Sequence, residues 1–338
     1  MIHNLLAEVE RAAAEEGLEF KGIKRGDRWE STHIKTSDSL DAVLDPEVML
    51  VAGTAWLFAR DELDRKLDTL VVDEAGQYSL ADTIACGTAA GRLVLLGDPL
   101  QLAQVKQGVH PGGSGASVLE HVLGEHETIP EHLGIFLEQT RRMHPAVCRF
   151  VSDAFYEGRL GSMPACAERT TSDGVGVRWL EVVHEGNRVD SDEEAESIAE
   201  EIERLLSHTF RDGGVERPLA YGDVIVVAPY NAQVRLLRER LPRAVEVGTV
   251  DKFQGREAAV VFYSMASSSG EDVPRGLDFL MSRNRLNVAV SRAQCLAYVA
   301  CSPRLLDVDC RTVEHLKLAN ALCRYVEIAA EQARATLV

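Results

Sequence analysis

The chain contains the run Leu70-Val71-Val72-Asp73-Glu74-Ala75-Gly76, in which an apolar stretch ends on two adjacent carboxylates. The apolar residues predict a strand over 67–72, so the two carboxylates follow its carboxyl end. That end of a strand is where open α/β sheets bind their ligands. In a nucleotide hydrolase, one such carboxylate holds Mg²⁺ and its neighbour orients and deprotonates the attacking water. A solvated turn between a strand and a helix has the same composition, so the pair is not decisive alone.

Apolar runs of strand length alternate with helical patterns along the chain. Strands are predicted at 48–52, 67–72, 92–96, 135–137, 177–182, 224–228, 245–247, 258–263 and 295–300, and helices at 80–90, 145–156, 191–207 and 312–330. This alternation predicts an α/β fold with parallel sheets that crossover helices cover. A polar stretch at 126–134 indicates the boundary between two domains, 1–133 and 134–338.

Length and composition are those of a globular protein with two domains. The chain has 338 residues, against a usual domain length of ~150. Hydrophobic residues make up 46% and charged residues 26%, so a sizeable core can form. With 36 basic and 53 acidic residues, the formal net charge is −17. This charge argues against coating of nucleic acid by bulk charge but does not exclude a local groove.

Neither a membrane span nor a secretory signal is predicted. The longest apolar stretch, 48–59, is interrupted by Gly53 and Thr54 and is well short of the ~20 residues that a membrane helix needs. The first residues lack a basic region, so the cytoplasm is the expected location. The seven cysteines contain no C-x-x-C pair and predict buried reduced thiols, with an iron–sulfur cluster on the last four as the alternative.

A second run places polar residues after the next predicted strand, in Leu95-Leu96-Gly97-Asp98-Pro99-Leu100-Gln101-Leu102. The side-chain amide of Gln101 can hydrogen-bond both a γ-phosphate oxygen and a hydrolytic water. Gly97 and Pro99 predict a tight turn that aims this amide. An ordinary turn remains the alternative for this run taken alone.

Four further segments follow in a fixed order, and the order gives the motifs their meaning. They are Gln139-Thr140-Arg141-Arg142-Met143-His144-Pro145, Ala228-Pro229-Tyr230-Asn231-Ala232-Gln233, Gly248-Thr249-Val250-Asp251-Lys252-Phe253-Gln254-Gly255-Arg256-Glu257 and Arg285-Leu286-Asn287-Val288-Ala289-Val290-Ser291-Arg292-Ala293. With the two earlier runs, this succession resembles motifs II, III, IV, V and VI of superfamily 1 helicases. The group is that of the nonsense-mediated-decay and replication helicase-nucleases, and the resemblance covers almost the whole chain.

The resemblance implies two RecA-like P-loop NTPase lobes with parallel sheets, and ATP as the cofactor between them. Carried over by position, Asp73 is expected to hold Mg²⁺ through its water shell, and Glu74 to act as the general base. Gln101 is expected to couple the γ-phosphate to the bound strand.

In the second lobe the resemblance assigns nucleotide contacts to five residues. Arg142 and Arg292 are the expected arginine fingers, because guanidinium groups neutralise the charge that spreads over a transferring phosphoryl group. Glu257 is expected to accept a hydrogen bond from the ribose, and Gly255 belongs to the same nucleotide-binding segment. Arg141 replaces an aromatic residue that stacks on adenine in several relatives, and its guanidinium plane could stack instead.

Nucleic-acid contacts are expected at Thr54, at Thr249 and around Tyr230, which match positions where relatives touch the backbone of a single strand. Hydroxyls and backbone amides suit a motor that grips phosphates without reading bases. An acidic run at 190–203 is interpreted as a solvent face turned away from nucleic acid. A basic cluster on the predicted helix after Tyr230 favours a solvated face over a groove; it consists of Arg235, Arg238, Arg240 and Arg243.

The largest departure from the family is that the sequence contains no G-x-x-x-x-G-K-[ST] run. The glycine-rich stretch at 112–117 has no lysine and follows motif III. We therefore expect a first lobe that is truncated at its amino end, inside motif Ia, and that exposes hydrophobic sheet surface and an unpaired edge. The missing part would belong to a longer helicase, together with an upstream nuclease domain; a genuine short protein that has lost hydrolysis is the alternative.

Two functions follow from these observations. The first is the motor portion of a DNA or RNA helicase, in which ATP hydrolysis drives 5′-to-3′ movement on a single strand. The second is a module that keeps the fold without hydrolysis and binds nucleic acid or a partner. In either case, we expect the isolated chain to hydrolyse ATP poorly or not at all.

Overall fold

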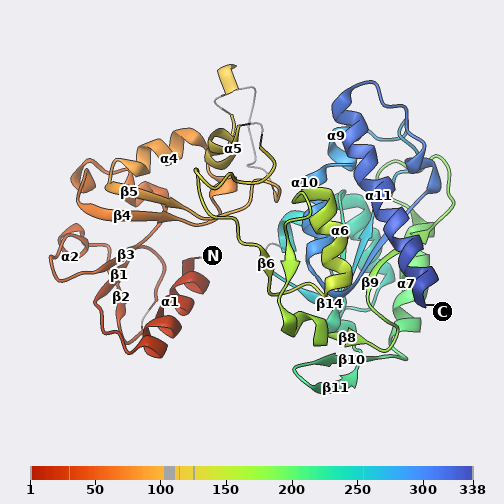
Figure 1. Ribbon diagram of the computed structural model, residues 1–338, viewed down its shortest axis with the longest axis horizontal. Helices are drawn as coiled ribbons and strands as arrows, with labels where there is room; N and C mark the ends of the chain where they lie inside the picture. Colours follow the sequence, from red (N-terminus) through yellow and green to blue (C-terminus); the bar gives the residue numbers. More distant parts are fainter. Residues whose placement is uncertain are drawn as a thin grey trace. The chain divides into compact units, whose positions relative to one another are not determined.

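The computed structural model describes residues 2–29, 31–102, 111–113, 115–124, 126–253 and 255–336 (Figure 1). The chain forms two compact units. Unit 1 comprises Met1–Pro99 and Ala103–Val122, and unit 2 comprises Leu100–Leu102 and Leu123–Val338. The chain thus first passes from unit 1 to unit 2 inside the second motif run, between Pro99 and Leu100. None of the described helices is long and apolar enough to cross a membrane.

Unit 1 contains two small parallel sheets. One has the strand order β2-β1-β3, formed by Ile34–Thr36, Gly22–Lys24 and Leu50–Ala52. The other pairs β4 (Leu67–Val72) with β5 (Ala90–Leu95). The helices of unit 1 are α1 (Ile2–Glu16), α2 (Leu40–Val43), α3 (Ala55–Phe58), α4 (Leu80–Gly87) and α5 (Val118–Leu123), the last ending where unit 2 begins.

The β4-β5 sheet is only partly buried. Leu70 and Val72 lie in the core of unit 1, at 5% and 7% exposure. Four apolar side chains are 42% to 49% exposed. Three belong to the sheet, Val71, Leu93 and Val94, and the fourth, Leu96, directly follows β5. The sequence predicted exposed hydrophobic sheet surface in the first lobe, and these side chains are that surface.

Unit 2 is built on a five-stranded parallel sheet with the order β13-β12-β14-β15-β9. In that order the strands are Glu246–Thr249, Val224–Ala228, Ala258–Ser264, Ala293–Cys301 and Gly176–Glu181. Every residue of β12 and of β14 is buried. Such uninterrupted apolar strands are typical of a parallel sheet that is covered on both faces. The predicted α/β class with parallel sheets is confirmed.

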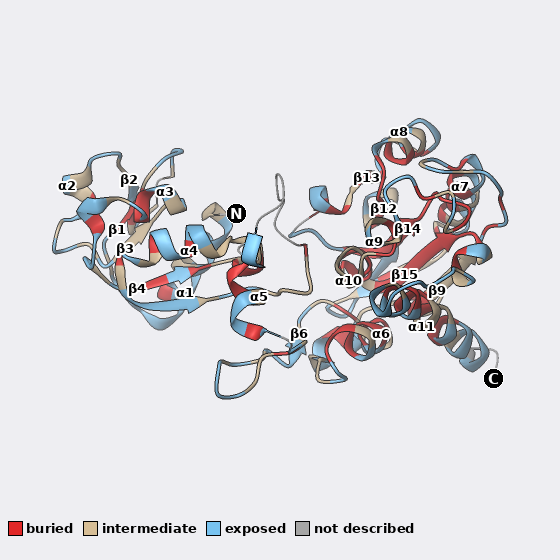
Figure 2. Ribbon diagram, turned by 90° about the horizontal axis from the view of Figure 1, so that it is seen from above, coloured by how far each residue is buried: buried red, intermediate tan, exposed pale blue. Residues whose placement is uncertain are grey.

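Helices cover both faces of this sheet (Figure 2). Alternate residues of each strand belong to the two separate cores on its two sides. Val261 and Tyr263 of β14 pack with α6 (Pro145–Phe155), α10 (Arg283–Ser291) and α11 (Val313–Thr336). Val260 and Phe262 pack with α7 (Asp192–Leu205) and α8 (Asn231–Arg240) on the other side.

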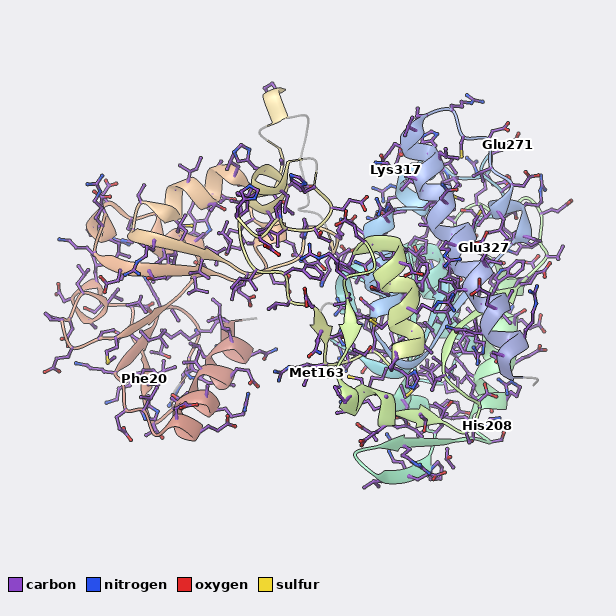
Figure 3. All side chains as sticks on the ribbon, in the orientation of Figure 1. Phe20, Met163, His208, Glu271, Lys317 and Glu327 are labelled. Carbon is purple, nitrogen blue, oxygen red and sulfur yellow. The ribbon has the colours of Figure 1, made fainter. Side chains whose placement is uncertain are left out.

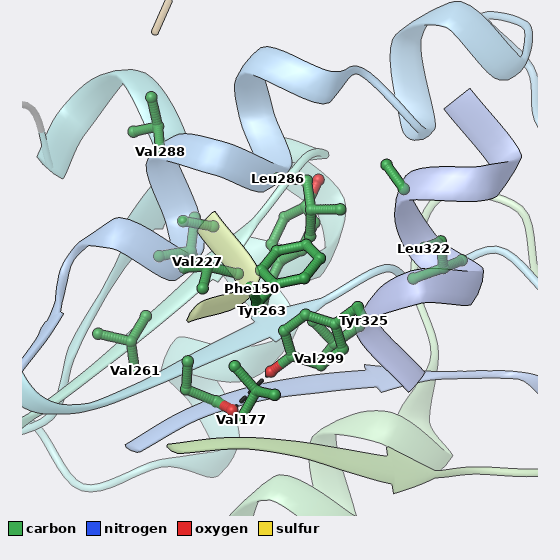
Figure 4. Close-up of a cluster of buried hydrophobic side chains, with 14 of the residues drawn as sticks. Phe150, Val177, Val227, Val261, Tyr263, Leu286, Val288, Val299, Leu322 and Tyr325 are labelled. Carbon is green, nitrogen blue, oxygen red and sulfur yellow. Dashed lines mark hydrogen bonds between the residues drawn. The ribbon is translucent and has the colours of Figure 1, made fainter. Parts of the chain in front are cut away.

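Aromatic side chains fill the first of these two interfaces (Figure 4). The ring of Phe150 lies edge-on to the rings of Phe155 and Tyr325, with centroids 5.6 and 4.9 Å apart. The hydroxyl of Tyr325 donates to the carbonyl oxygen of Ala297, 2.5 Å away. This bond attaches α11 to β15 inside the core, so the long helix is fixed by packing and by a satisfied polar group.

Smaller elements surround this core. A short parallel pair joins β6 (Gln139–Thr140) to β7 (Gly161–Ser162). An antiparallel sheet with the order β11-β10-β8 is formed by Val215–Pro218, Thr209–Asp212 and Thr170–Thr171. The strand predicted at 135–137 is wrong: pairing begins only at Gln139, and Ile135 and Leu137 are 87% and 78% exposed.

We predict that Phe150→Ala lowers the free energy of unfolding by about 3–5 kcal/mol, because the ring is fully buried and its loss leaves a cavity. Urea denaturation followed by circular dichroism measures the change. The control, Ile135→Ala, removes an exposed side chain and should change the same quantity by less than about 0.5 kcal/mol. Equal effects of the two substitutions would contradict the assigned core.

Candidate nucleotide and nucleic-acid sites

The two carboxylates predicted to serve Mg²⁺ and water lie directly after β4, in unit 1. Both Asp73 and Glu74 are half-buried, and the backbone N–H of Glu74 donates to Asp73 Oδ1 over 3.0 Å. Glu74 has φ 55° and ψ 40°, the left-handed conformation that costs a residue with a side chain roughly 1–2 kcal/mol. Strained backbone of this kind concentrates at functional sites.

The turn after β5 packs against this carboxylate turn, backbone to backbone. The N–H of Ala75 donates to the carbonyl oxygen of Leu96 over 2.7 Å. A Cβ on Gly97, whose φ is 153°, would lie 2.7 Å from Ala75 N, and a Cβ on Gly76 would lie 2.5 Å from the carbonyl oxygen of Asp98. The glycines therefore permit a close approach of two turns, which the sequence suggested only as a tight bend at Gly97.

Gln101 is held by unit 2, whereas Asp73 and Glu74 belong to unit 1. Its backbone carbonyl accepts a hydrogen bond from the Asn284 side chain, and the carbonyl of Leu100 accepts one from Asn287 Nδ2 at 2.9 Å. Asn287 is buried and lies inside the fourth motif segment. Neither asparagine was assigned a role from the sequence.

Arg142 and Glu257 form an ion pair in unit 2. Arg142 Nε donates to Glu257 Oε2 over 2.7 Å, and Arg142 Nη1 donates to the carbonyl oxygen of Ser291 over 3.1 Å. Gln294 Nε2 donates to the other oxygen of Glu257 over 2.8 Å. Burial tends to raise the pKa of Glu257, but the hydrogen bonds from Arg142 and Gln294 outweigh it, so the pKa lies below its ordinary value.

Arg292 is placed beside this pair by the strand that follows it. Its side chain is almost fully buried, and its Nη1 lies 3.5 Å from the carbonyl oxygen of Arg256. The carbonyl of Arg292 accepts the N–H of Ala258 over 3.1 Å. Because Ala258 begins β14 and Ala293 begins β15, Arg142, Glu257 and Arg292 share the amino-terminal edge of the sheet.

The remaining two nucleotide candidates, Arg141 and Gly255, shortly precede Arg142 and Glu257 in the same segments. Arg141 is exposed, and so is Gly255, which has φ 76°. Arg141 therefore has a free surface on which its guanidinium plane can stack.

Arg169 is a functional candidate that sequence reasoning missed. Its Nη1 donates to the carbonyl oxygens of Arg141 and Arg142, over 3.0 and 3.2 Å. Its Nε donates to Asp212 Oδ1 over 2.9 Å, and Asp212 ends β10 in the antiparallel sheet. The backbone of both candidate arginines is thus attached to that sheet. No motif marks Arg169, so only the folded structure reveals it.

The nucleic-acid candidates of unit 2 lie at the opposite, carboxyl-terminal edge of the sheet. Tyr230 follows β12, Thr249 ends β13, and Thr249 pairs with Ala228 in the sheet. The ring of Tyr230 is only 6% exposed and lies 5.4 Å from that of Phe279, so the ring itself offers no exposed surface to a nucleic acid. Thr54 lies in unit 1, exposed, directly before α3.

The basic cluster on α8 is partly occupied by contacts within unit 2. Arg238 donates to the carbonyl oxygen of Val247 over 2.9 Å, and Arg240 pairs with Asp192 at 2.6 Å. These contacts favour the solvated helix face that was predicted for the cluster. Cysteines follow the prediction for the most part: Cys310 is exposed and Cys323 half-buried, and the other five are buried.

Comparison with known proteins identifies the class. The model of the AAA domain family matches residues 115–304, more than half of the chain, and the chain belongs to this family. It is 30% identical over 261 residues to the DNA-binding protein SMUBP-2 of Rattus norvegicus, and 29% identical over 246 residues to the DNA polymerase alpha-associated DNA helicase A of Schizosaccharomyces pombe. It is 28% identical over 267 residues to the ATP-dependent helicase NAM7 of Saccharomyces cerevisiae. The predicted membership of superfamily 1 helicases of this group is confirmed.

The matches cover most of this chain but only part of each relative. The match with SMUBP-2 covers 71% of this chain and 25% of the relative. The match with helicase A covers 68% of this chain and 36% of the relative, and the match with NAM7 covers 72% of this chain and 26% of the relative. The chain therefore spans about a quarter to a third of the length of these relatives. A solved structure of the arterivirus helicase, nonstructural protein 10, covers 86% of this chain at 15% identity and a TM-score of 0.42, and the match spans 49% of that protein.

We predict that Glu257→Gln flattens the dependence of thermal stability on pH. A lowered pKa means that the carboxylate stabilises the fold above the ordinary glutamate pKa of about 4.3, and that this contribution is lost as pH falls through the lowered value. The unfolding midpoint of the original chain should thus fall more between roughly pH 6 and pH 3 than that of the variant. The contribution is below about 1 kcal/mol, because the pair is partly exposed.

The matched control is Glu271→Gln, which changes an exposed carboxylate in a loop of unit 2. Its midpoint should follow the original chain across the whole pH range. Unfolding midpoints of Glu257→Gln and of the original chain that change equally with pH would contradict the assigned ion pair.

Proposed function

We propose that this chain is the motor portion of an ATP-dependent helicase, or translocase, that moves 5′-to-3′ on single-stranded DNA or RNA. One observation carries the proposal: Arg142, Glu257 and Arg292 meet at the amino-terminal edge of the unit 2 sheet. Separate segments of the chain supply the three side chains, in the order that superfamily 1 helicases have. Family membership and the named helicase relatives support the same conclusion.

The residues at the end of β4 fit a Mg²⁺ ion that accompanies a nucleotide. Mg²⁺ prefers one or two carboxylates and keeps several water ligands, so it does not need a cage of protein side chains. Asp73 offers a half-buried carboxylate of this kind, and Glu74 is held next to it by the strained turn. In the proposal, Asp73 holds the ion through water and Glu74 accepts the proton of the attacking water.

ATP, when bound, supplies the phosphoryl group whose transfer to water drives movement. Arg142 and Arg292 would neutralise the charge that develops on that group, an effect worth on the order of 10³–10⁵ in rate. Glu257 already accepts bonds from Arg142 and Gln294, and its oxygens keep further lone pairs for a ribose hydroxyl. Gln101 would sense the γ-phosphate from a segment whose backbone unit 2 holds.

A second function is favoured by a different observation. The sequence has no P-loop, and the β4-β5 sheet exposes Val71, Leu93, Val94 and Leu96. A chain with these properties could bind nucleic acid or a partner protein without hydrolysing ATP. In the first proposal, the P-loop would come from another part of the same gene product, with a nuclease domain upstream as a further partner.

We predict that the purified chain binds a fluorescent single-stranded oligonucleotide and releases little or no phosphate from ATP, with or without nucleic acid. Fluorescence anisotropy and a colorimetric phosphate assay measure the two quantities. Binding should weaken as salt is raised, because phosphate contacts release counterions. Robust phosphate release that nucleic acid stimulates would contradict the need for a P-loop. Absence of binding would contradict the helicase proposal and the nucleic-acid-binding form of the second function.

Thr249→Val tests directly whether Thr249 binds the phosphate backbone of the single strand. Loss of one hydrogen bond to a phosphate should raise the dissociation constant about fivefold, which corresponds to about 1 kcal/mol. Thr69→Val is the control, because Thr69 is an exposed residue inside β4 and lies at neither end of that strand. If both variants bind like the original chain, Thr249 does not touch the strand.

A further inference from the structure

Phe279 lies between two arginines in a way that no motif predicts. The Cζ atoms of Arg275 and Arg285 are 3.9 and 4.2 Å from the centroid of its ring. Phe279 belongs to α9 (Leu277–Leu280) and is half-buried, while Arg275 is exposed in the loop before it. Arg285 lies in the first turn of α10 and donates to the carbonyl oxygen of Phe279 over 3.4 Å.

Within the described ranges, no carboxylate forms an ion pair with Arg275 or Arg285. Three acidic residues are nearby in the sequence. Asp272 accepts from the hydroxyl of Ser269 at 2.7 Å, Asp278 lies 3.6 Å from His315, and Glu271 is exposed and forms no ion pair in the described ranges. Two like charges over one ring repel each other unless an anion offsets them. In a chain of net charge −17, two arginines that form no ion pair in the described ranges favour a binding surface for an anion.

The position of this surface connects it to the nucleic-acid candidates of unit 2. Phe279 lies 5.4 Å from Tyr230, which follows β12, and the loop that carries Arg275 follows β14. Figure 3 labels Glu271 of this loop at the end of unit 2 opposite Met163. The N–H of Met163 donates to the carbonyl oxygen of Thr140, so Met163 marks the end that carries Arg142. The surface is thus at the edge away from Arg142, Glu257 and Arg292.

We propose that Arg275, Phe279 and Arg285 form a base-stacking and phosphate-binding surface for single-stranded nucleic acid. The guanidinium groups would bind backbone phosphates, and the guanidinium plane of the exposed Arg275, which the Phe279 ring holds in place, would stack on a base without reading its identity. This inference rests on the proposed function, because it extends the expected contacts at Thr249 and Tyr230. It adds aromatic and cationic groups to contacts that were otherwise hydroxyls and backbone.

The test measures binding of fluorescent oligothymidylate and oligouridylate to the full chain at several salt concentrations. Arg275→Gln should raise the dissociation constant about threefold to tenfold and lower the slope of log affinity against log salt by about 1. Phe279→Leu keeps an apolar side chain but removes the ring; it should weaken binding about tenfold and leave the salt slope almost unchanged. Arg334→Gln is the matched control, because Arg334 is exposed in the last turn of α11.

The outcomes separate this inference from the proposed function. If the original chain binds, Thr249→Val weakens binding, and Arg275→Gln and Phe279→Leu behave like Arg334→Gln, then the surface is not used and the proposed function stands. If the original chain binds neither oligonucleotide, both fail. Arg275 is the residue of choice for the first measurement, since it is exposed and its replacement removes no described hydrogen bond. Circular dichroism of Phe279→Leu checks that the variant is folded.

Discussion

Burial of both faces of the unit 2 sheet is the constraint on which the two candidate sites of this unit depend. Every residue of β14 is buried, and helices pack on each side. A ligand can therefore reach this sheet only where its strands begin or end. With seven residues, β14 separates these two edges by roughly 23 Å. Parallel strands then give each edge its own set of loops, and in the proposed function the two sets serve different chemistry.

At the edge where β14 and β15 begin, charged groups hold one another in place. Arg142 is fixed by Glu257 and by the carbonyl of Ser291, and Arg169 holds its backbone. Such preorganisation matters in phosphoryl transfer, where the protein contributes position and charge rather than covalent chemistry. At the opposite edge the groups are a threonine, backbone, and two arginines on an aromatic ring, which suits an extended polyanion. A motor needs both kinds of surface on one rigid body.

Local sequence determines the strands of unit 2 well, because long apolar runs such as 258–264 have few alternatives to a buried strand. The strand expected at 135–137 failed because apolar residues alone do not provide a pairing partner. The motif order made Arg142, Glu257 and Arg292 candidates, but the contact between Arg142 and Glu257 joins positions 115 residues apart in the sequence. Arg169 and the Phe279 surface depend wholly on tertiary packing, so no local pattern could reveal them.

The central claim is that nucleic acid binds at the carboxyl-terminal edge of the unit 2 sheet and leaves the amino-terminal edge free for nucleotide. Amide hydrogen exchange of the full chain, with and without a single-stranded oligonucleotide, tests it most directly. We expect slower exchange in the segments 229–231, 249–251 and 265–281, and unchanged exchange at 140–143 and 256–258. Slower exchange at 140–143 and 256–258, with unchanged exchange at the other three segments, would contradict binding of nucleic acid at the carboxyl-terminal edge.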